Sequence, residues 1–162
     1  MRDLSSAIPE PPGEGDHARG PLAGPALVFY GDFTCPDCAV AALALREAPV
    51  RVHFRHLAIS SRHRRAVPLA QAAEAAGAQG RFWEFHDTLF EDPGHVDDPH
   101  LWERCRSLGI DVARFEADRR SAAVRERVRG QTSEALRGGA IGTPSFLVGG
   151  RVFASLEEAL GR

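Results

Sequence analysis

The stretch GDFTCPDCAVAALAL, residues 31–45, places two cysteines two residues apart, where an apolar run gives way to helix-forming residues. The run before it, residues 26–30 (ALVFY), is continuously apolar, which is typical of a strand buried on both faces. Pro36 suits the first position of a helix, and good helix formers continue as far as Ala48, before Pro49. The stretch therefore predicts a strand, a turn that carries the cysteines, and a helix over residues 36–48.

A second strand is expected directly after this helix. In residues 50–59 (VRVHFRHLAI), an apolar set alternates with a polar set that consists of Arg51, His53 and Arg55. This period of two predicts a strand with one apolar and one polar face. Because two consecutive strands joined by a helix run parallel, the segment as a whole predicts a βαβ unit.

The rest of the chain reads as helical until near its end. Apolar residues recur at helical spacing over about residues 64–138, with Asp98 as the expected cap of one helix. Residues 145–148 and 151–153 then flank Gly149-Gly150, which predicts an antiparallel hairpin, and Ser155 with Glu158 predicts a capped closing helix. The order predicts an α/β, thioredoxin-like fold with an all-helical insertion between the βαβ and ββα halves.

The first 25 residues differ in composition from the rest of the chain. They are rich in proline, glycine and charge, which predicts a flexible or extended N-terminal arm over residues 1–25. Residues 26–162 are expected to form a single domain, with the helical insert at about 64–138, since 162 residues suffice for one hydrophobic core.

Composition excludes several classes of function. The formal net charge is −2, so no global electrostatic attraction to nucleic acid or to an anionic membrane is expected. All twenty basic residues are arginine, which we interpret as a biased genomic composition. No apolar stretch is long enough to span a membrane and no signal peptide is recognisable, so the sequence predicts a cytoplasmic protein.

The cysteine pair carries the chemistry. Cys35 lies just before the predicted helix, where unpaired N–H groups and the helix dipole favour a thiolate. Cys38, one turn on, is expected to be more buried and to attack a mixed disulfide at Cys35. Asp37 places a carboxylate between them, which opposes the thiolate and predicts a weaker oxidant. Asp37 is therefore expected to tune the redox properties of the pair.

Two other roles for the pair are weighed against redox exchange. Structural zinc needs four ligands, and the seven histidines supply no matching pair nearby. A permanent disulfide would close so small a loop that it would contribute little stability. The third cysteine, Cys105 in LWERCRSLG, is expected to be a small core residue, with a further redox thiol as the alternative.

Five segments in this order resemble the DsbA-like thioredoxin family of disulfide oxidoreductases: FTCPDC, FRHL, AAEAAGAQGRFWEFHDTLFE, LGIDVARFEAD and GTPSFLVGGRVF. The resemblance covers about residues 16–154. It implies that Cys35 is the attacking thiolate and Cys38 the resolving thiol. It also implies that Pro144 is a cis-proline facing the disulfide, although an X-Pro bond taken alone is more often trans.

The resemblance also implies how a substrate would be held. Thr143 would offer its backbone to an extended substrate peptide, as in strand addition. Phe33 and Pro36 would shape the rim of the site. Many members of the family carry a signal or anchor, which is not recognisable here, and strong oxidants of the family often have histidine at the position of Asp37. The family also includes domains fused to unrelated proteins.

The sequence thus predicts a thiol–disulfide oxidoreductase that acts on protein or low-molecular-weight thiols and disulfides. It needs no organic cofactor or metal, and neither a nucleic acid nor a membrane is expected as a partner. One alternative is a thioredoxin-scaffold binding module, for which the loop SSRHRRAVP, residues 60–68, would supply a basic patch. Another is an enzyme similar to kappa-class glutathione transferases or 2-hydroxychromene-2-carboxylate isomerases, which generally lack the full Cys-x-x-Cys.

Overall fold

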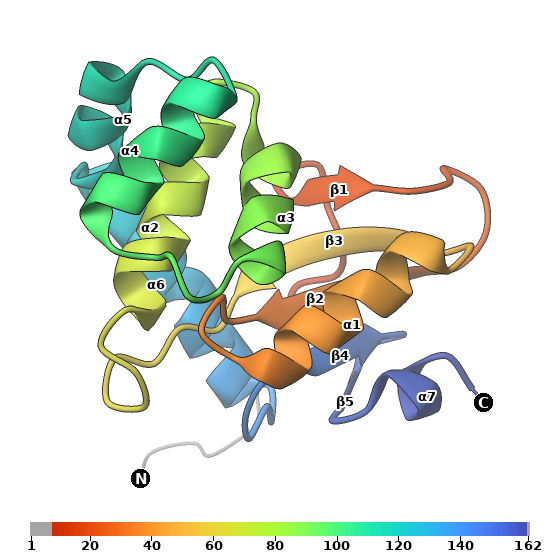
Figure 1. Cartoon of the computed structure of the whole chain (residues 1–162). Helices are drawn as coiled ribbons and strands as arrows, with labels where there is room; N and C mark the ends of the chain where they lie inside the picture. Colours follow the sequence, from red (N-terminus) through yellow and green to blue (C-terminus); the bar gives the residue numbers. More distant parts are fainter. Residues whose placement is uncertain (1–7, 162) are drawn as a thin grey trace, which may run out of the picture.

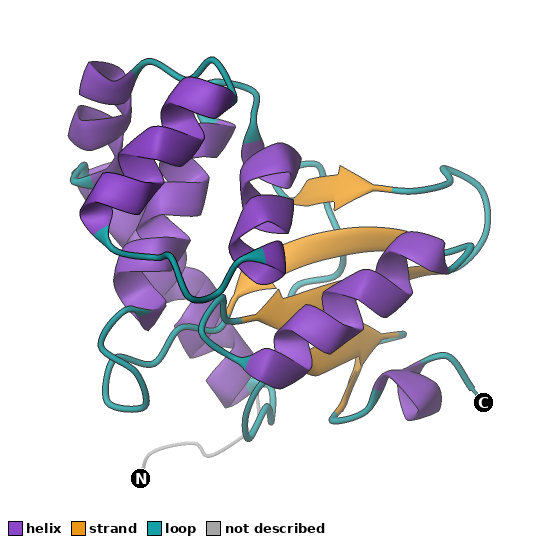
Figure 2. Cartoon of the chain, in the orientation of Figure 1, coloured by secondary structure: helices purple, strands orange, loops and turns teal. Residues whose placement is uncertain are grey.

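The computed structural model describes residues 8–161, which contain one mixed five-stranded sheet and seven α-helices (Figures 1 and 2). The sheet has the order β1-β3-β2-β4-β5. Its strands are β1 (His17–Arg19), β2 (Ala26–Gly31), β3 (Arg51–His56), β4 (Ser145–Val148) and β5 (Arg151–Phe153). The helices are α1 (Pro36–Glu47), α2 (Ala66–Gly77), α3 (Phe82–Glu91), α4 (Asp98–Ser107), α5 (Val112–Arg119), α6 (Ala122–Arg137) and α7 (Leu156–Ala159).

The order of elements confirms the predicted fold class. β2 and β3 run parallel on either side of the α1 connection, and β4 and β5 form the antiparallel hairpin. Helices α2 to α6 lie between these halves in the chain and pack together beside the sheet (Figure 1). β2 pairs with both β3 and β4, so the turn after β2 lies where the two halves of the fold meet.

The central strand is buried on both faces, as its apolar run predicts. Leu27 and Phe29 belong to the core that includes α1 and α3, whereas Val28 and Tyr30 face residues from α6 and its C-terminal loop. Phe29 stacks on Phe146 with ring centroids 5.6 Å apart, which joins β2 to β4 within this core. The period of two in the strand therefore divides the interior into two packed layers.

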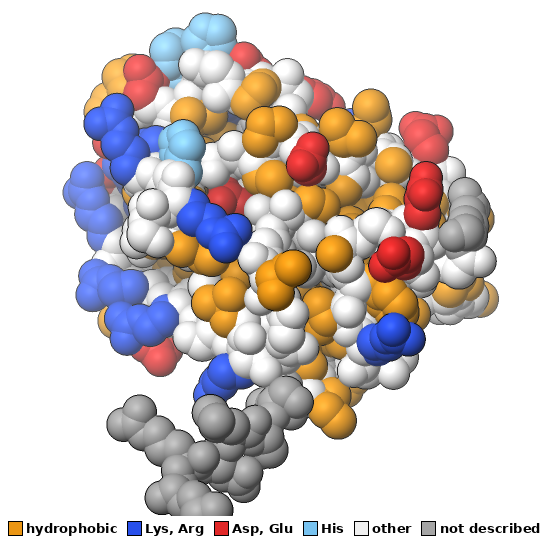
Figure 3. Space-filling model, turned by 90° about the horizontal axis from the view of Figure 1, so that it is seen from below, with side chains coloured by type: hydrophobic (Ala, Val, Ile, Leu, Met, Phe, Trp, Pro, Cys, Tyr) orange, Lys and Arg blue, Asp and Glu red, His pale blue; other side chains and the backbone are white. Residues whose placement is uncertain are grey.

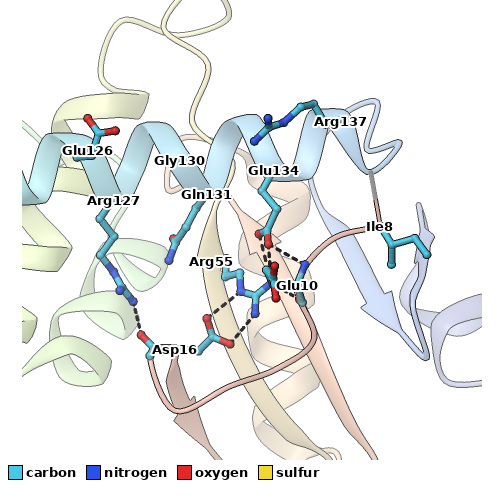
Figure 4. A pocket seen from close by; sticks show the side chains of 11 residues that line it. Ile8, Glu10, Asp16, Arg55, Glu126, Arg127, Gly130, Gln131, Glu134 and Arg137 are labelled. Atoms are coloured by element: carbon cyan, nitrogen blue, oxygen red, sulfur yellow. Dashed lines mark hydrogen bonds and ion pairs between the residues drawn. The ribbon is translucent and has the colours of Figure 1, made fainter. Parts of the chain in front are cut away.

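The expected polar face of β3 is instead buried. Arg55 is only 4% exposed, because the segment before β1 and helix α6 both cover this side of the strand (Figure 4). Its guanidinium donates to the two carboxylate oxygens of Asp16 at 2.8 and 2.9 Å and to Glu134 at 3.2 Å. It also donates to the carbonyl oxygens of Glu10 and Pro11 at 2.7 and 2.8 Å. The arginine therefore fixes the segment before β1 to the sheet.

β1 is a strand that the sequence analysis does not predict. It pairs antiparallel with β3 at the edge of the sheet, with His17 opposite Phe54. Helix α3 supports it through Trp83, whose indole N–H donates to the carbonyl of Ala18 at 3.2 Å. Arg19 adds a bidentate pair with Asp87 at 2.9 and 3.0 Å. Side chains of the insert thus hold the N-terminal segment as a strand.

Three smaller expectations concern helix ends and the third cysteine. The cap of α4 is Asp97, whose side chain accepts from the N–H of His100, and not Asp98, which is the first helical residue. Ser155 caps α7 as predicted, by accepting from the N–H of Glu158 at 3.1 Å. Cys105 is fully buried in the core, as expected, and burial raises the pKa of its thiol to about 11.

Candidate active site

The turn between β2 and α1 is shaped by Asp32. The Asp32 carboxylate accepts from the Thr34 backbone N–H at 2.8 Å and from the Thr34 hydroxyl at 2.6 Å. The backbone N–H of Cys35 donates to the Asp32 carbonyl at 3.1 Å. Asp32 is itself buried, so the turn is held from beneath. Asp32 is not among the site residues predicted from the sequence, although an aspartate that hydrogen-bonds the backbone two residues on is a known turn signal.

Cys35 and Cys38 lie at the start of α1, both as thiols. Cys35 is the N-cap residue in an extended conformation, with Pro36 at the first helical position. Its carbonyl accepts from the N–H of Cys38 at 3.1 Å and that of Ala39 at 3.3 Å. Cys35 is partly exposed, whereas Cys38 is fully buried, and burial raises the pKa of the Cys38 thiol well above its usual range. The two thiols therefore differ in their access to solvent.

The loop before β4 brings Thr143 and Pro144 to the cysteines. Pairing of β2 with β4 sets Tyr30 opposite Ser145, so the residues just beyond each strand end lie side by side. The Cys35 thiol donates to the Thr143 carbonyl oxygen, with 3.5 Å between the sulfur and oxygen atoms. The Thr143–Pro144 peptide bond is cis. The fold thus brings Cys35 into contact with Thr143, which lies 108 positions later in the chain.

The remaining predicted site residues divide into two groups. Pro36 and Asp37 are exposed beside Cys35, where a substrate can reach them. Phe33 was predicted at the rim of the site, but it is only 2% exposed and its ring points into the core. There it lies 5.5 Å from the ring of Phe54 and 4.9 Å from that of Phe90, centroid to centroid. Phe33 anchors the turn from below and is unavailable to a substrate.

Near Phe33, charged and polar side chains gather around the buried carboxylate of Glu74. His56 and His17 each direct Nε2 at Glu74, at 2.8 and 3.0 Å, and Arg127 pairs with the same carboxylate at 3.1 Å. Burial opposes ionisation of Glu74, but hydrogen bonds from the two histidines outweigh it and lower the pKa of the carboxyl. This group ties β1, β3, α2 and α6 together under the active-site turn.

Other kinds of site are poorly represented in the described part of the chain. Among residues 8–161, no three His, Cys, Asp or Glu side chains are grouped so as to hold a metal ion. Within the same range, no helix is both long and apolar enough to cross a membrane. A pocket of about 520 Å³ between the N-terminal segment and α6 contains none of the predicted site residues (Figure 4).

The comparisons with known proteins agree with this geometry. The model of the DSBA-like thioredoxin domain family matches residues 46–160 of the chain, a range that begins after the cysteine pair. The chain belongs to this family. The resemblance stated from its sequence motifs is thereby confirmed, and with it the class of enzyme, since the DsbA family is one of thiol–disulfide oxidoreductases.

Solved structures of similar proteins cover nearly the whole domain. A thioredoxin-like oxidoreductase from Silicibacter pomeroyi superposes with a TM-score of 0.77 at 25% identity, over 93% of this chain and 92% of that one. The oxidoreductase DsbA from Xylella fastidiosa superposes with a TM-score of 0.64 at 26% identity, over 84% of this chain and 79% of that one.

The curated relatives are larger proteins. The Na(+)/H(+) antiporter NhaA 1 of Salinispora arenicola is 41% identical in an alignment over 146 residues that covers 84% of this chain and 22% of the antiporter. The antiporter NhaA of Herminiimonas arsenicoxydans is 41% identical in an alignment over 153 residues that covers 88% of this chain and 24% of that protein. The chain thus spans about a quarter or less of the curated relatives it matches.

Proposed function

We propose that the chain exchanges disulfides with protein or small thiol substrates through Cys35 and Cys38, next to Pro144. The observation that carries this proposal is the position of Cys35. It lies partly exposed at the N-terminus of α1, with its sulfur 3.5 Å from the Thr143 carbonyl, while Cys38 lies buried one turn behind it. A substrate can therefore reach the sulfur of Cys35, whereas Cys38 is buried and can react only with Cys35.

The exchange follows from this difference between the thiols. In the reducing direction, the Cys35 thiolate attacks one sulfur of a substrate disulfide, and the other substrate sulfur leaves as a thiolate. Cys38 then gives up its proton and attacks the Cys35 sulfur, which releases the second substrate thiolate and forms the Cys35–Cys38 disulfide. The substrate gains two electrons and the protein loses two. Substrate oxidation is the reverse sequence.

Substrate binding is proposed to use the loop before β4. A peptide that adds as a strand beside Thr143 would present its sulfur next to Cys35. Pro36 and Asp37 would form the opposite rim. Asp37, exposed beside Cys35, is proposed to tune the pair so that its disulfide is a weaker oxidant.

Trapping of mixed disulfides tests the proposal. Cys38→Ala should accumulate mixed disulfides on non-reducing gels, because nothing resolves them, and Cys35→Ser should form none. Cys105→Ser is the matched control, since that thiol is fully buried in α4, and it should behave as the unaltered protein. If Cys35→Ser retains its bound partners, the chain is instead a binding module that uses the thioredoxin scaffold.

The reduction potential sets the direction of the exchange. Equilibration in glutathione or dithiothreitol buffers, followed by alkylation and mass spectrometry, measures it. A value near about −120 to −180 mV indicates an oxidant or isomerase, and one near about −270 mV indicates a reductant. Failure to form a reversible disulfide between Cys35 and Cys38 at any poise would contradict the proposal.

The curated relatives suggest where such a domain acts. In them, the matching region is part of a protein named as a Na(+)/H(+) antiporter. We propose that this domain acts on a membrane transporter of that class. We also propose that the domain lies in the cytoplasm, as the sequence predicts. In cells that express Cys38→Ala, the Cys35 thiolate should then attack a transporter disulfide and remain bonded to one of its sulfurs, so that isolated membranes contain a mixed disulfide with the transporter. An equal yield from Cys35→Ser would refute this partner.

A further inference from the structure

The loop after β3 lies beside the cysteines. β2 and β3 are parallel, with Gly31 opposite His56, so the turns that come after the two strands leave the same edge of the sheet. Leu57 continues this pairing, since its N–H donates to the Gly31 carbonyl at 3.0 Å. In open α/β sheets this edge, at the carboxyl ends of parallel strands, is where ligands bind. The predicted basic patch, residues 60–68, begins only three residues later.

Arg62 reaches from this loop to the loop that holds Pro144. A turn closed by the Arg62 N–H and the Ile59 carbonyl, at 3.0 Å, sets its backbone. Its guanidinium donates to the Ile141 carbonyl at 3.1 Å, and the other terminal nitrogen lies 3.2 Å from the place a Cβ would occupy on Gly142. Ile141 is two residues before Thr143, whose carbonyl contacts Cys35. The Arg62 guanidinium is therefore offset from that carbonyl by about the length of two extended residues.

No acidic side chain among residues 8–161 neutralises this cation. Arg65 on the same loop pairs with Asp98 at 3.3 Å, but no ion pair in that part of the chain involves Arg62 or the exposed Arg64. A guanidinium has five N–H donors, and Arg62 uses one of them on the Ile141 carbonyl. The other donors of this exposed side chain have no hydrogen-bond partner among residues 8–161.

The surrounding face is divided by charge. Seen from below, arginine side chains gather mostly on the side of the helical insert, acidic side chains mostly on the opposite side, and hydrophobic side chains between them (Figure 3). Ile141, beside Arg62, contributes an apolar group that is 81% exposed. A substrate that crosses this face would meet an apolar surface with a cation at one edge.

We propose that Arg62 selects peptide substrates that carry an acidic side chain close to the reacting cysteine. This inference rests on the proposed function, and it names the substrate class of that same site. A glutamate two residues from the cysteine of an extended peptide would match the two-residue offset between Ile141 and Thr143. Its carboxylate would accept hydrogen bonds from the free donors of Arg62 while the peptide lies on the Thr143 loop.

The test uses short peptides with blocked ends, in which cysteine is held as a mixed disulfide with 5-thio-2-nitrobenzoate. The Cys35 thiolate attacks the peptide sulfur and releases the coloured aryl thiolate; Cys38 then attacks Cys35 and releases the peptide thiol. The peptides carry glutamate or glutamine two residues before or two residues after the cysteine. Rates with reduced protein are compared for the unaltered chain and for Arg62→Gln.

The expected result is a preference for glutamate over glutamine of about two- to fivefold at low salt, in one of the two positions. This preference should disappear in Arg62→Gln and fade in high salt, because the ion pair is exposed. Arg151→Gln is the matched control. Arg151 is exposed and lies opposite Val148 in the β4–β5 ladder, at the end of β4 that is far from Pro144. The preference for glutamate should therefore remain in Arg151→Gln.

Either of two results would overturn the inference: equal rates for the glutamate and glutamine peptides, or a preference that Arg62→Gln leaves intact. Failure of the proposed function is distinguishable, because the glutamine peptides would then also release no aryl thiolate. Circular dichroism of Arg62→Gln checks that the exposed substitution leaves the fold unchanged.

Discussion

Replacing Arg55 by alanine removes the cation that joins the N-terminal segment, β3 and α6. Asp16 is buried beside it, and Glu134 is half-buried. Burial opposes ionisation of Asp16, but hydrogen bonds from Arg55 outweigh it and lower the pKa of the carboxyl. Without Arg55, that carboxylate loses both of its hydrogen bonds to the guanidinium while it remains in the interior.

The cost of Arg55→Ala follows from this geometry. Breaking a buried ion pair by removing one partner costs about 3–5 kcal/mol, which is a large part of the 5–15 kcal/mol typical of a domain. For a chain of this size, the melting temperature should fall by about 6–20 °C. Urea unfolding followed by circular dichroism measures the change in the free energy of unfolding directly.

Arg46→Ala is the matched control, because Arg46 pairs with Glu91 where both side chains are exposed. Its effect should lie within about 0–1 kcal/mol. If Arg55→Ala costs no more stability than this control, the prediction that Asp16 remains as an unpaired buried charge is wrong. In that case the N-terminal segment detaches and water reaches Asp16. Limited proteolysis before β1 would show that detachment.

Further predictions concern pH, redox tuning and the active-site turn. Burial lowers the pKa of His86 to about 4, so unfolding takes up a proton and stability should fall as pH drops from 6.5 towards 4, measured by urea midpoints. Burial opposes ionisation of Asp87, but hydrogen bonds from His86 and Arg19 outweigh it and lower the pKa of this carboxyl to about 2. Protonation of Asp87 should therefore cause a further loss of stability below about pH 4, and this loss should be absent in Asp87→Asn. Asp37→Asn should make the disulfide more oxidising by about 10–20 mV in glutathione buffers; an unchanged potential would rule out this tuning. Asp32→Ala should cost about 1–2 kcal/mol and slow exchange, whereas Asp32→Asn, which keeps an acceptor, should retain most of both.

Local patterns predicted the elements that local forces determine. The apolar run of β2, the proline at the start of α1 and the paired glycines of the hairpin each act within a few residues, and the structure has all of them. The cysteine pair and its position at a helix N-terminus follow from the same short stretch. The placement of Thr143 beside Cys35 came instead from a family resemblance, since no local pattern joins residues so far apart.

The features that the sequence did not predict depend on distant partners. Arg55 reads as a solvated strand residue until Asp16 and Glu134 come to it from two other parts of the chain. The family resemblance implied that Phe33 lies at the rim of the site, but its ring packs against Phe54 and Phe90 in the core. In both cases, burial is decided by tertiary packing.

The contact between the Cys35 thiol and the Thr143 carbonyl has a consequence for synthesis of the protein. The two residues are 108 positions apart, so the cysteines leave the ribosome well before the loop that faces them. At about 5–20 residues per second, this interval is roughly 5–20 s. During that time the thiols of Cys35 and Cys38 are exposed, because neither the neighbouring loop nor the closed core has yet formed around them. Each newly made molecule is therefore most open to unselective oxidation before its final strands exist.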